Sequence, residues 1–585
     1  MVDVAPDIAR TPPHVLHEYA ILADGERGAV VGPRGDIAWL CFPRWDSDPV
    51  FDTLLGGPGG YSIAPDAPYV WGGSYVEGTL IWHSRWVTNA GIVESREALC
   101  YPGDPHRMVL LRRVQALDAA ARVAVWLRPS DQWQELHRHG DTWTARVGGL
   151  YLRWTGAAQA HARDRRGALL LPLDLAAGQH HDLVLELSDR PLPDEPVDAD
   201  TAWRATETAW REAVPACAAA LDPRHTRHSY AVLRGLTGRG GGMVAAATTG
   251  LPERADAGRD YDYRYVWIRD QCYAGQAAAT IGPDPLLDDA VRFVADRLLA
   301  DRDRLAPAYT TLGEPVPDPH SLGLPGYPGG SDLAGNRVNK QFQLDSFGEA
   351  LLLFATAAGY DHLDGKHWDA VRLAANAIEE HWREPDAGIW ELDDNAWTHS
   401  RLIAAAGLRA VAATISQAAP SLRTEGWDWL TLADRIVADT STHALHPDGH
   451  WQRTPDDPQV DAALLIPALR GATPADDPRA LATFDAYLRE LADEGYAYRF
   501  RHDPRPLSEA EGSFLLCGFL VSLTHHQHGN PVQARSWYEI TRTATGPARL
   551  FSEEYDAVQQ QMRGNLPQAF VHALHLETAH RLVDP

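Results

Sequence analysis

The chain has 585 residues, a formal net charge of -26 at pH 7, and 45% hydrophobic against 23% charged residues. This length is too great for one ordinary core, so we expect two large domains, or a small domain beside a large closed one. The excess of acidic residues argues against a nucleic-acid partner, because proteins that bind phosphates concentrate Lys and Arg into patches. A neutral, soluble substrate fits this composition better.

The cysteines and the N-terminal residues restrict the cellular setting. The five cysteines are odd in number, widely scattered and without CxxC spacing, which fits neither a disulfide framework nor a zinc site. The first twenty residues contain no basic segment followed by an apolar run, and no later stretch approaches the length that spans a bilayer. We therefore expect reduced thiols, no membrane partner and a cytoplasmic location.

Residues from about 17 to 190 have the pattern of short strands. Alternating runs recur between Gly, Pro and Asp, as in RMVLLRRVQAL at 107–117 and HDLVLELSD at 181–189. Alternation with turn residues at short intervals is typical of two packed antiparallel sheets. The sequence therefore predicts an N-terminal antiparallel β-sandwich domain over residues 1–197.

The pattern changes to helical spacing after the predicted strands. Trp, Ala and Val recur at helical intervals in TAWRATETAWREAV at 201–214. We expect a helical linker over residues 198–224 that leads into a second domain over residues 225–585.

The second domain is expected to be almost entirely helical. Helices are predicted at about 226–237, 269–281, 283–300, 341–359, 366–382, 399–418, 425–443, 458–469, 477–492, 510–528, 530–545 and 567–582. About twelve helices are what six helical hairpins closed into a ring require, and the loops at one rim of such a ring are free to form a site. An open helical solenoid is the alternative, although no short fixed repeat supports it.

An aromatic segment at 259–271 is the first candidate for chemistry. In RDYDYRYVWIRDQ, Tyr263, Tyr265 and Trp267 alternate before Arg269 and Asp270 begin a helix. Alternation places the three rings on one side of an extended segment, and the Arg and Asp can donate to and accept from sugar hydroxyls. The alternative is an aromatic strand followed by a helix-capping Asp with a surface ion pair.

A turn-like segment at 388–400 is the second candidate. GIWELDDNAWTHS carries Trp390 and Glu391 just before a predicted helix. A carboxyl beside an indole can have its pKa raised by desolvation, as a general acid at neutral pH requires. The alternative is a solvent-facing Glu in a loop that holds several acids.

Two further segments lie near the C-terminus. LFSEEYD at 550–556 carries Glu553 and Glu554, of which only one is expected to face a pocket because successive side chains diverge. Its alternative is a helix N-terminus capped by Ser552. RGNLPQAFVHA at 563–573 shapes the loop into the last helix, and its alternative is a plain helix start at Pro567.

The order of these motifs resembles glycoside hydrolase family 15, in its bacterial glucoamylase-, trehalase- or glucodextranase-like members, over nearly the whole chain. The resemblance begins with ILADGERGAVVGPRGDIAWLCFPRWDS at 21–47, where Trp45 stands in place of the family's Phe. It continues through TTGLPE at 248–253, YDYRYVWIRD at 261–270, GIWE with the later THS, and SEEYD followed by GN-PQAF-H. Five motifs in the same sequential order are far more specific than any one of them.

The resemblance implies a fold and a set of roles. An N-terminal antiparallel β-sandwich is expected to precede a catalytic (α/α)6 barrel. Glu391 falls on the family's general acid and Glu553 on its general base, while Glu554 has no assigned role. Arg269 and Asp270 fall on the pair that grips the terminal sugar at the blind end of a pocket.

The aromatic residues of these motifs also fall on family positions. Tyr263 would help hold the attacking water, and Trp267 would stack or hydrogen-bond in the same subsite, with Trp390 beside the acid. Inversion requires a protonated carboxyl at the leaving oxygen and an ionised one across the sugar, with a separation of roughly 6.5–9.5 Å that leaves room for water. Neither a metal nor an organic cofactor is required.

One loop departs from the family pattern. Where relatives have Pro-Val-Arg-x-Gly-Asn, this chain has SDLAGNRVNKQFQLD at 331–345, and Arg401 stands where Lys is common. Asn336, Lys340 and Gln341 are the candidates for shaping the leaving-group subsite.

The expected activity is exo-acting hydrolysis of an α-linked glucoside such as trehalose or a malto- or isomalto-oligosaccharide. A glycoside phosphorylase on a similar scaffold is an alternative, but it needs no protein base, and Glu553 counts against it. A sugar-binding protein that has kept the fold is the other alternative, since fold does not fix function. The linkage, the identity of the terminal sugar and a possible homo-oligomer are left open.

Overall fold

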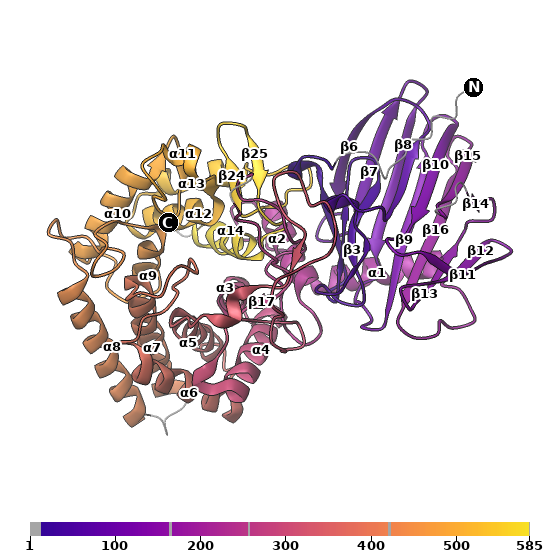
Figure 1. Ribbon diagram of the computed structural model, residues 1–585. Coiled ribbons are helices and arrows are strands. Elements are labelled where there is room, and N and C mark those ends of the chain that lie inside the picture. The colour runs from indigo at the N-terminus through magenta and orange to yellow at the C-terminus, as the bar shows by residue number, and fades with distance from the viewer. Residues whose placement is uncertain (1–12, 163–166, 256–257, 419–422, 584–585) are drawn as a thin grey trace.

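The computed structural model describes residues 13–583 apart from 163–166, 256–257 and 419–422. A β-sandwich forms one end of the molecule and a ring of helices forms the other (Figure 1). The prediction of an antiparallel β-sandwich followed by an (α/α)6 barrel is confirmed. Residues 1–12 of the predicted sandwich domain lie outside the described residues.

The sandwich consists, within the described residues, of two sheets of eight strands in which every pair is antiparallel. The first sheet contains β1 (Ala20–Ala23), β2 (Gly28–Val31), β3 (Asp36–Cys41), β4 (Pro49–Phe51), β5 (Gly60–Pro65), β10 (Ala121–Arg128), β14 (His161–Ala162) and β15 (Leu169–Leu175). The second sheet contains β6 (Tyr69–Tyr75), β7 (Trp82–Thr88), β8 (Ile92–Leu99), β9 (Arg107–Ala116), β11 (Trp133–His139), β12 (Thr142–Val147), β13 (Leu150–Thr155) and β16 (His180–Ser188).

Alternation of side chains explains why these strands pack face to face. In β15, Leu169, Leu171, Leu173 and Leu175 are buried, whereas the residues between them are partly or fully exposed. Successive side chains of a strand point to opposite faces, so one face of β15 enters the core and the other meets solvent. The period that predicted the strands therefore also places the core between the two sheets.

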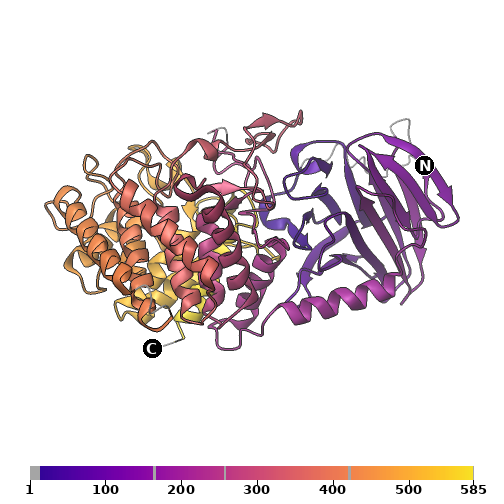
Figure 2. The same ribbon diagram turned by 90° about the horizontal axis from the view of Figure 1, so that it is seen from below.

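Helix α1 (Ala199–Ala213) follows the last sandwich strand and lies along that domain (Figure 2). The ring of Trp210 stacks on Tyr101 with centroids 4.0 Å apart, and the Arg96 guanidinium lies over Trp203. The predicted linker 198–224 thus begins with a helix packed on the sandwich, continues in irregular backbone and ends at the first residues of α2 in the barrel. We retain 1–197, 198–224 and 225–585 as a proposed division of the chain.

Within the described residues the barrel has an inner ring of six helical segments. The ring closes because each inner segment contacts the next and the last contacts the first. These segments are α3 (Ile268–Ala279), α5 (Asp345–Ala358), α7 (Thr398–Ala418), the 3-10 turn Ala462–Leu465 with α9 (Ile466–Leu469), α12 (Leu515–Gln527) and α14 (Ala569–Arg581). The outer helices are α2 (Pro223–Leu236), α4 (Pro285–Asp301), α6 (Gly365–His381), α8 (Arg423–His443), α10 (Pro478–Leu491) and α13 (Pro531–Arg542). All described side chains of α3 are buried, as expected for an inner helix.

Several predicted helices are shorter in the structure. The segment predicted as one helix over 510–528 contains the short helix α11 (Leu507–Ala510), strand β23 (Ser513–Phe514) and then α12. Strand β24 (Glu554–Asp556) pairs with β23 and with β25 (Gln561–Arg563). The helix N-terminus considered for 550–556 is therefore wrong, because this segment is extended and its backbone bonds go to neighbouring strands.

Arg264 connects the sandwich to the barrel beside the aromatic segment. Its guanidinium is fully buried and donates to Cys41 Sγ and to the carbonyl oxygens of Trp45 and Ser47 at 3.1–3.2 Å. It also pairs with Asp262 at 2.7 Å. The N-terminal domain thereby fixes the backbone next to Tyr263.

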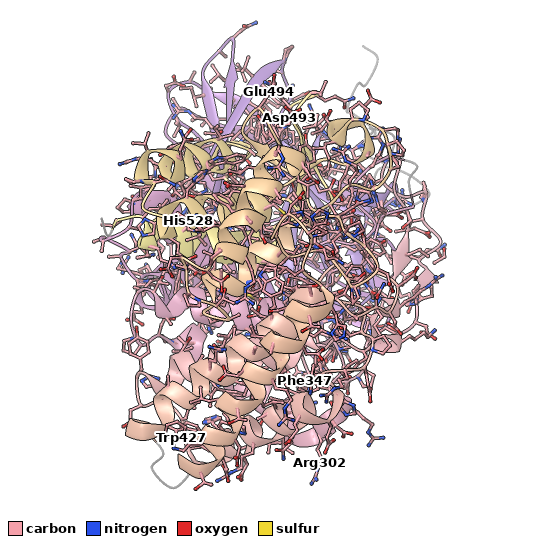
Figure 3. The ribbon with its side chains drawn as sticks, turned by 90° about the vertical axis from the view of Figure 1, so that its left-hand side faces the viewer. Arg302, Phe347, Trp427, Asp493, Glu494 and His528 are labelled. Carbon is pink, nitrogen blue, oxygen red and sulfur yellow. The ribbon has the colours of Figure 1, made fainter. Side chains whose placement is uncertain are left out.

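The far side of the barrel, which Figure 3 shows, is formed by outer helices and connecting loops, with Trp427 of α8 at the surface. Among the described residues, we find no helix with both the length and the apolar character needed to cross a membrane. All five cysteines are free thiols.

Candidate active site

A cavity of about 590 Å³ lies at the rim of the barrel, a size typical of small-molecule sites. Its walls come from segments far apart in the chain, and they include nine of the ten residues predicted for the site. These are Tyr263, Trp267, Arg269, Asp270, Asn336, Gln341, Trp390, Glu391 and Glu553. Four of the candidate segments thus meet at one place, because the loops between inner and outer helices converge on the same rim.

Glu391 lies in the loop between α6 and α7. Its φ of +54° is unusual for a residue with a side chain, and such backbone is found where the surroundings impose it. The turn is closed by a hydrogen bond from Glu391 N–H to Gly388 O. A Cβ at Gly388, itself at φ +66°, would lie 2.9 Å from the Trp397 ring, so this turn requires glycine.

Asp386 fastens the base of the same loop. Its carboxylate accepts from Gly388 N–H at 2.9 Å and from the Ser400 hydroxyl at 2.7 Å, and it pairs with Arg401 at 3.2 Å. Burial raises the pKa of Asp386 to about 7, although Arg401 acts in the opposite direction. Arg401 therefore holds the loop that carries Glu391 and is not among the residues lining the cavity.

Glu553 lies just before β24 in a more enclosed environment. Its backbone carbonyl accepts from Leu515 N–H, and its side chain is buried at the cavity wall. Burial raises the pKa of Glu553 well above the ordinary range, and the nearby Glu253 carboxyl raises it further. The Arg499 guanidinium and a hydrogen bond from Tyr263 lower this pKa.

Tyr263 and Trp267 connect the two carboxyls. The Tyr263 hydroxyl donates to Glu553 Oε1 at 2.7 Å, and Trp267 Nε1–H donates to Glu391 Oε1 at 2.6 Å. The two rings meet edge to face with centroids 5.5 Å apart. Each carboxyl thus receives one aromatic donor from this segment. Tyr265 packs in the core and does not line the cavity, so the prediction that all three rings share one side is wrong for Tyr265, where the backbone bends.

Arg269 and Asp270 open helix α3 and form a buried, charged part of the cavity wall. Arg269 donates to Gln343 at 3.0 Å and lies 3.4 Å from Glu391 and 3.6 Å from Asp345. Burial raises the pKa of Asp270 to about 6, and the neighbouring Arg269 lowers it. Asp270 is thus part of a buried charge network, which differs from the surface ion pair considered as its alternative.

A buried charge cluster behind Glu553 was not predicted from the sequence. The Arg499 guanidinium pairs with Glu253 at 3.0 Å, with Glu554 at 3.3 Å and with Glu511. The other oxygen of Glu554 accepts from Gly512 N–H at 3.0 Å. Glu554 therefore fixes Arg499 behind the wall, while Glu553, the preceding residue, faces the cavity.

The sequence contained a partial signal for this cluster. Arg499 and Glu511 flank a short polar stretch before the apolar run FLLCGFLVSL, and Glu253 closes the TTGLPE motif. Nothing local connects Glu253 to the other two, because it lies 246 residues before Arg499, and charges in loops are usually solvated.

The candidate residues of loop 331–345, which departs from the family pattern, do not all reach the site. Asn336 and Gln341 line the cavity, Asn336 Nδ2 donating to Asp262 O and Gln341 Oε1 accepting from Gln343. Lys340 is not a lining residue, since it is largely exposed and pairs with Asp318 at 2.9 Å. Its long side chain keeps its charge in solvent, and we do not retain it as a sugar ligand.

One part of the charge cluster has the spacing of a metal site. Oxygens of Glu253, Glu511 and Glu554 lie within 4.8 Å of one another. The Arg499 guanidinium pairs with all three and supplies the compensating positive charge. The arrangement is therefore a buried ion-pair network.

Comparison with known proteins gives the same family. The model of glycosyl hydrolases family 15 matches residues 236–580, and a trehalase-like N-terminal model matches residues 10–134. The trehalase of Mycobacterium tuberculosis is 29% identical, over 96% of this chain and 89% of its own length. Trehalase 1 of Sulfolobus acidocaldarius is 25% identical, over 95% and 97% respectively.

A solved structure shares the whole architecture. A bacterial glucoamylase complexed with acarbose covers 98% of this chain and 97% of its own, with a TM-score of 0.70 at 12% identity. This similarity establishes the fold. Because the family model spans more than half of the chain, the protein belongs to glycosyl hydrolases family 15 and is a glycoside hydrolase.

Proposed function

We propose that the protein is an inverting, exo-acting trehalase that hydrolyses α,α-trehalose to glucose. Glu391 protonates the leaving oxygen, and Glu553 takes a proton from the water that attacks the anomeric carbon. The product from the attacked ring is β-glucose, because water enters opposite to the departing sugar. The observation that carries the proposal is that both carboxyls line one cavity and each receives its own aromatic donor.

The surroundings of the two carboxyls support this order of roles. The side chain of Glu391 is 26% exposed, whereas Glu553 is 4% exposed. In a pocket that holds the terminal sugar, the leaving group lies toward the opening, so the more accessible carboxyl is placed to protonate it. The enclosed carboxyl is placed beside a confined water, and the Tyr263 hydroxyl can orient both.

The proposed role of Glu553 depends on its protonation state as well as on its position. A base must be ionised, while burial and Glu253 raise the pKa of Glu553. The Tyr263 hydroxyl and the Arg499 guanidinium favour the ionised form. A base with a raised pKa is also a stronger acceptor, provided that the working pH lies above that pKa. We therefore expect the activity to fall steeply on the acid side.

Arg269 and Asp270 account for action at a chain end. Both are buried, and both line the cavity beside Glu391. A guanidinium and a carboxylate can bind several hydroxyls of one terminal sugar, which fixes the ring in the orientation needed for reaction. A longer chain then has room only on the leaving-group side.

We propose trehalose as the substrate because the relatives that match nearly the whole chain are trehalases. The two trehalases named above align with at least 95% of this chain, so the similarity extends over the sandwich as well as the barrel. Asn336 and Gln341 line the leaving-group side of the cavity in this proposal and would contact the second glucose.

A substrate panel with anomer detection tests the proposal. Purified enzyme is given α,α-trehalose, maltose, nigerose, isomaltose and longer oligomers, and early product is followed by proton NMR. We expect trehalose to be cleaved fastest, with equal early amounts of α- and β-glucose, one from the leaving sugar and one from the attacked ring. Early release of α-glucose alone from trehalose, or of α-glucose from the non-reducing end of maltose, would refute inversion.

The same assay separates hydrolysis from phosphorolysis. A phosphorylase would form glucose 1-phosphate and would depend on phosphate as co-substrate, whereas a hydrolase releases two glucose molecules. The presence of Glu553 at the cavity wall, with a hydroxyl donor in place, favours hydrolysis.

A cytoplasmic location is part of the proposal. Five free thiols, four of them buried with a strongly raised pKa, fit a chain that matures under reducing conditions. Fractionation of the producing cells, with trehalase activity measured in each fraction, tests it.

A further inference from the structure

A chain of buried polar side chains lies behind the segment that carries Glu553, just before β24. It consists of Ser229 on α2, Tyr538 on α13, and His572 and His575 on α14, all fully buried. None of the four lines the cavity. His572 is the last residue of the PQAFVH motif, to which the proposed mechanism gives no role.

The tautomer of His572 follows from one fixed donor. Phe551 N–H lies 3.2 Å from His572 Nε2, and an amide can only donate. His572 Nε2 must therefore be unprotonated. Burial lowers the pKa of His572 well below its ordinary value, so the ring is neutral and its proton is on Nδ1.

The proton on His572 Nδ1 is donated to Ser229 Oγ at 2.9 Å, so both ring nitrogens of His572 are engaged in this one tautomer. Ser229 Oγ also lies 2.9 Å from His575 Nδ1, and His575 Nε2 lies 3.1 Å from the Tyr538 hydroxyl oxygen. Both ring nitrogens of each buried histidine therefore have a hydrogen-bond partner.

The chain ends on the backbone that leads into Glu553. Phe551 is held at its N–H by His572 and at its carbonyl by Gln568 N–H at 2.8 Å. Its ring packs against His572, with centroids 4.9 Å apart. On the other side, Glu553 O accepts from Leu515 N–H at 3.1 Å. The residues flanking the carboxyl are therefore fixed from both sides.

We propose that His572 is a positioning residue for Glu553, acting through its Nε2 acceptor on Phe551 N–H, with Ser229 and His575 fixing the tautomer that makes this bond possible. The inference depends on the role proposed for Glu553. Its physical basis is that a base two residues from an unsatisfied, buried amide would lose its fixed place opposite the sugar. A displacement on the order of 1 Å costs about 100-fold in rate.

Two amide substitutions at position 572 distinguish the acceptor role of His572 Nε2 from the donor role of Nδ1. In His572→Gln, the side-chain oxygen can take the place of Nε2 and accept from Phe551 N–H, although the bond to Ser229 is lost. In His572→Asn, the amide can take the place of Nδ1 and keep Ser229, but it leaves Phe551 N–H without a partner. We expect kcat on trehalose to fall ~10- to 100-fold in His572→Asn and less than ~3-fold in His572→Gln, with KM within ~2-fold of wild type in both.

A second measurement distinguishes positioning from general damage. In the Glu553→Ala background, azide attacks the anomeric carbon in place of water and needs no base, so its attack does not depend on where residue 553 holds a carboxyl. Adding His572→Asn to Glu553→Ala should therefore leave the azide-supported rate within ~2-fold of that of Glu553→Ala alone. The two substitutions are coupled, because His572 is proposed to act only through the position of Glu553. A loss as large as that in the wild-type background would show a merely structural role and overturn the proposal.

The controls cover folding and the underlying function. Circular dichroism checks that each variant is folded. If His572→Asn does not fold, Ser229→Ala tests the same chain and should lower kcat ~3- to 10-fold at unchanged KM. Wild-type kcat in a folded His572→Asn, or in Ser229→Ala used in its place, would overturn the inference alone. Wild-type activity of Glu553→Ala would instead overturn the proposed function.

Discussion

The loop that carries Glu391 and the strand that carries Glu553 are held in different ways. Glu391 is fixed by neighbours in sequence, through the turn at Gly388 and the Asp386 carboxylate. Glu553 is fixed by Leu515 and Tyr263 and by the bonds that His572 and Gln568 make to the flanking Phe551, and these residues come from separate parts of the barrel. One half of the site is thus a local structure, and the other depends on closure of the whole ring.

The electrostatic surroundings of Glu391 and Glu553 also differ. Glu391 meets Arg269 and the Trp267 indole, while Glu553 lies beside a guanidinium shared by three other carboxyls. Changes around Glu391 should therefore alter the transfer of a proton to the leaving group. Changes around Glu553 should alter the pH range in which the enzyme works.

The largest effect is expected from removal of the base. Glu553→Ala should lower kcat on trehalose by about 10³- to 10⁴-fold, because no other group can take the proton of the attacking water. Added azide should restore turnover and give β-glucosyl azide, since the anion enters from the side of the missing carboxyl. The rate and the product are measured by NMR. Unchanged activity would point to Glu554 or to another base.

The next effect is expected from removal of the acid. Glu391→Gln should lower kcat on trehalose about 10²- to 10³-fold, because the glucose leaving group departs unprotonated. With α-glucosyl fluoride, whose leaving group needs no proton, the loss should be less than about 10-fold.

The matched control for this substitution is Asp394→Asn. Asp394 is an exposed acid of the same loop and does not line the cavity. It should keep wild-type rates on both substrates. If Glu391→Gln lost kcat equally on trehalose and on α-glucosyl fluoride, this would contradict the role of Glu391 as the acid. It would reverse the roles assigned to Glu391 and Glu553.

Removal of the aromatic donors should give smaller effects, which should differ between the Glu391 and Glu553 parts of the site. Tyr263→Phe and Trp267→Phe each remove one hydrogen bond to a carboxyl, and each should lower kcat about 10-fold. Because the Tyr263 bond lowers the pKa of Glu553, its loss should raise that pKa. The acid limb of kcat/KM against pH should then move to higher pH in Tyr263→Phe, and the Trp267→Phe profile should not show this upward move. An identical pH profile for the two variants would argue against separate roles.

The same comparison explains what the sequence could predict. The strand period of β15 and the apolar character of α5 and α12 are local properties, so sandwich and barrel followed from the pattern. The segments around Tyr263 and Glu391 were found because their residues are close in sequence. The resemblance to a family then joined them to Glu553, which no spacing rule could have done.

The unpredicted features depend on contacts between distant segments. The three-stranded sheet of β23, β24 and β25 has strands of two or three residues, too short to show a period. The Arg499 cluster joins four segments, and the placement of Lys340 outside the cavity depends on how its loop folds. Local patterns carry little information on such packing.

The smallest expected effect is a shift of pH range caused by Glu253. Its carboxyl raises the pKa of Glu553, so Glu253→Gln should lower that pKa. The base would then remain ionised to lower pH, and the acid limb of kcat/KM should move down, opposite to its movement in Tyr263→Phe. The rate on the neutral plateau should change less than about 5-fold, since the glutamine can still accept from Arg499. Glu494→Gln, an exposed change in the β21–β22 hairpin (Ala492–Asp493 and Tyr496–Ala497; Figure 3), is the control and should leave the profile unchanged. An acid limb of Glu253→Gln that stays in place would show that the titrating group is not Glu553, because a carboxyl coupled to Glu253 must respond when that charge is removed.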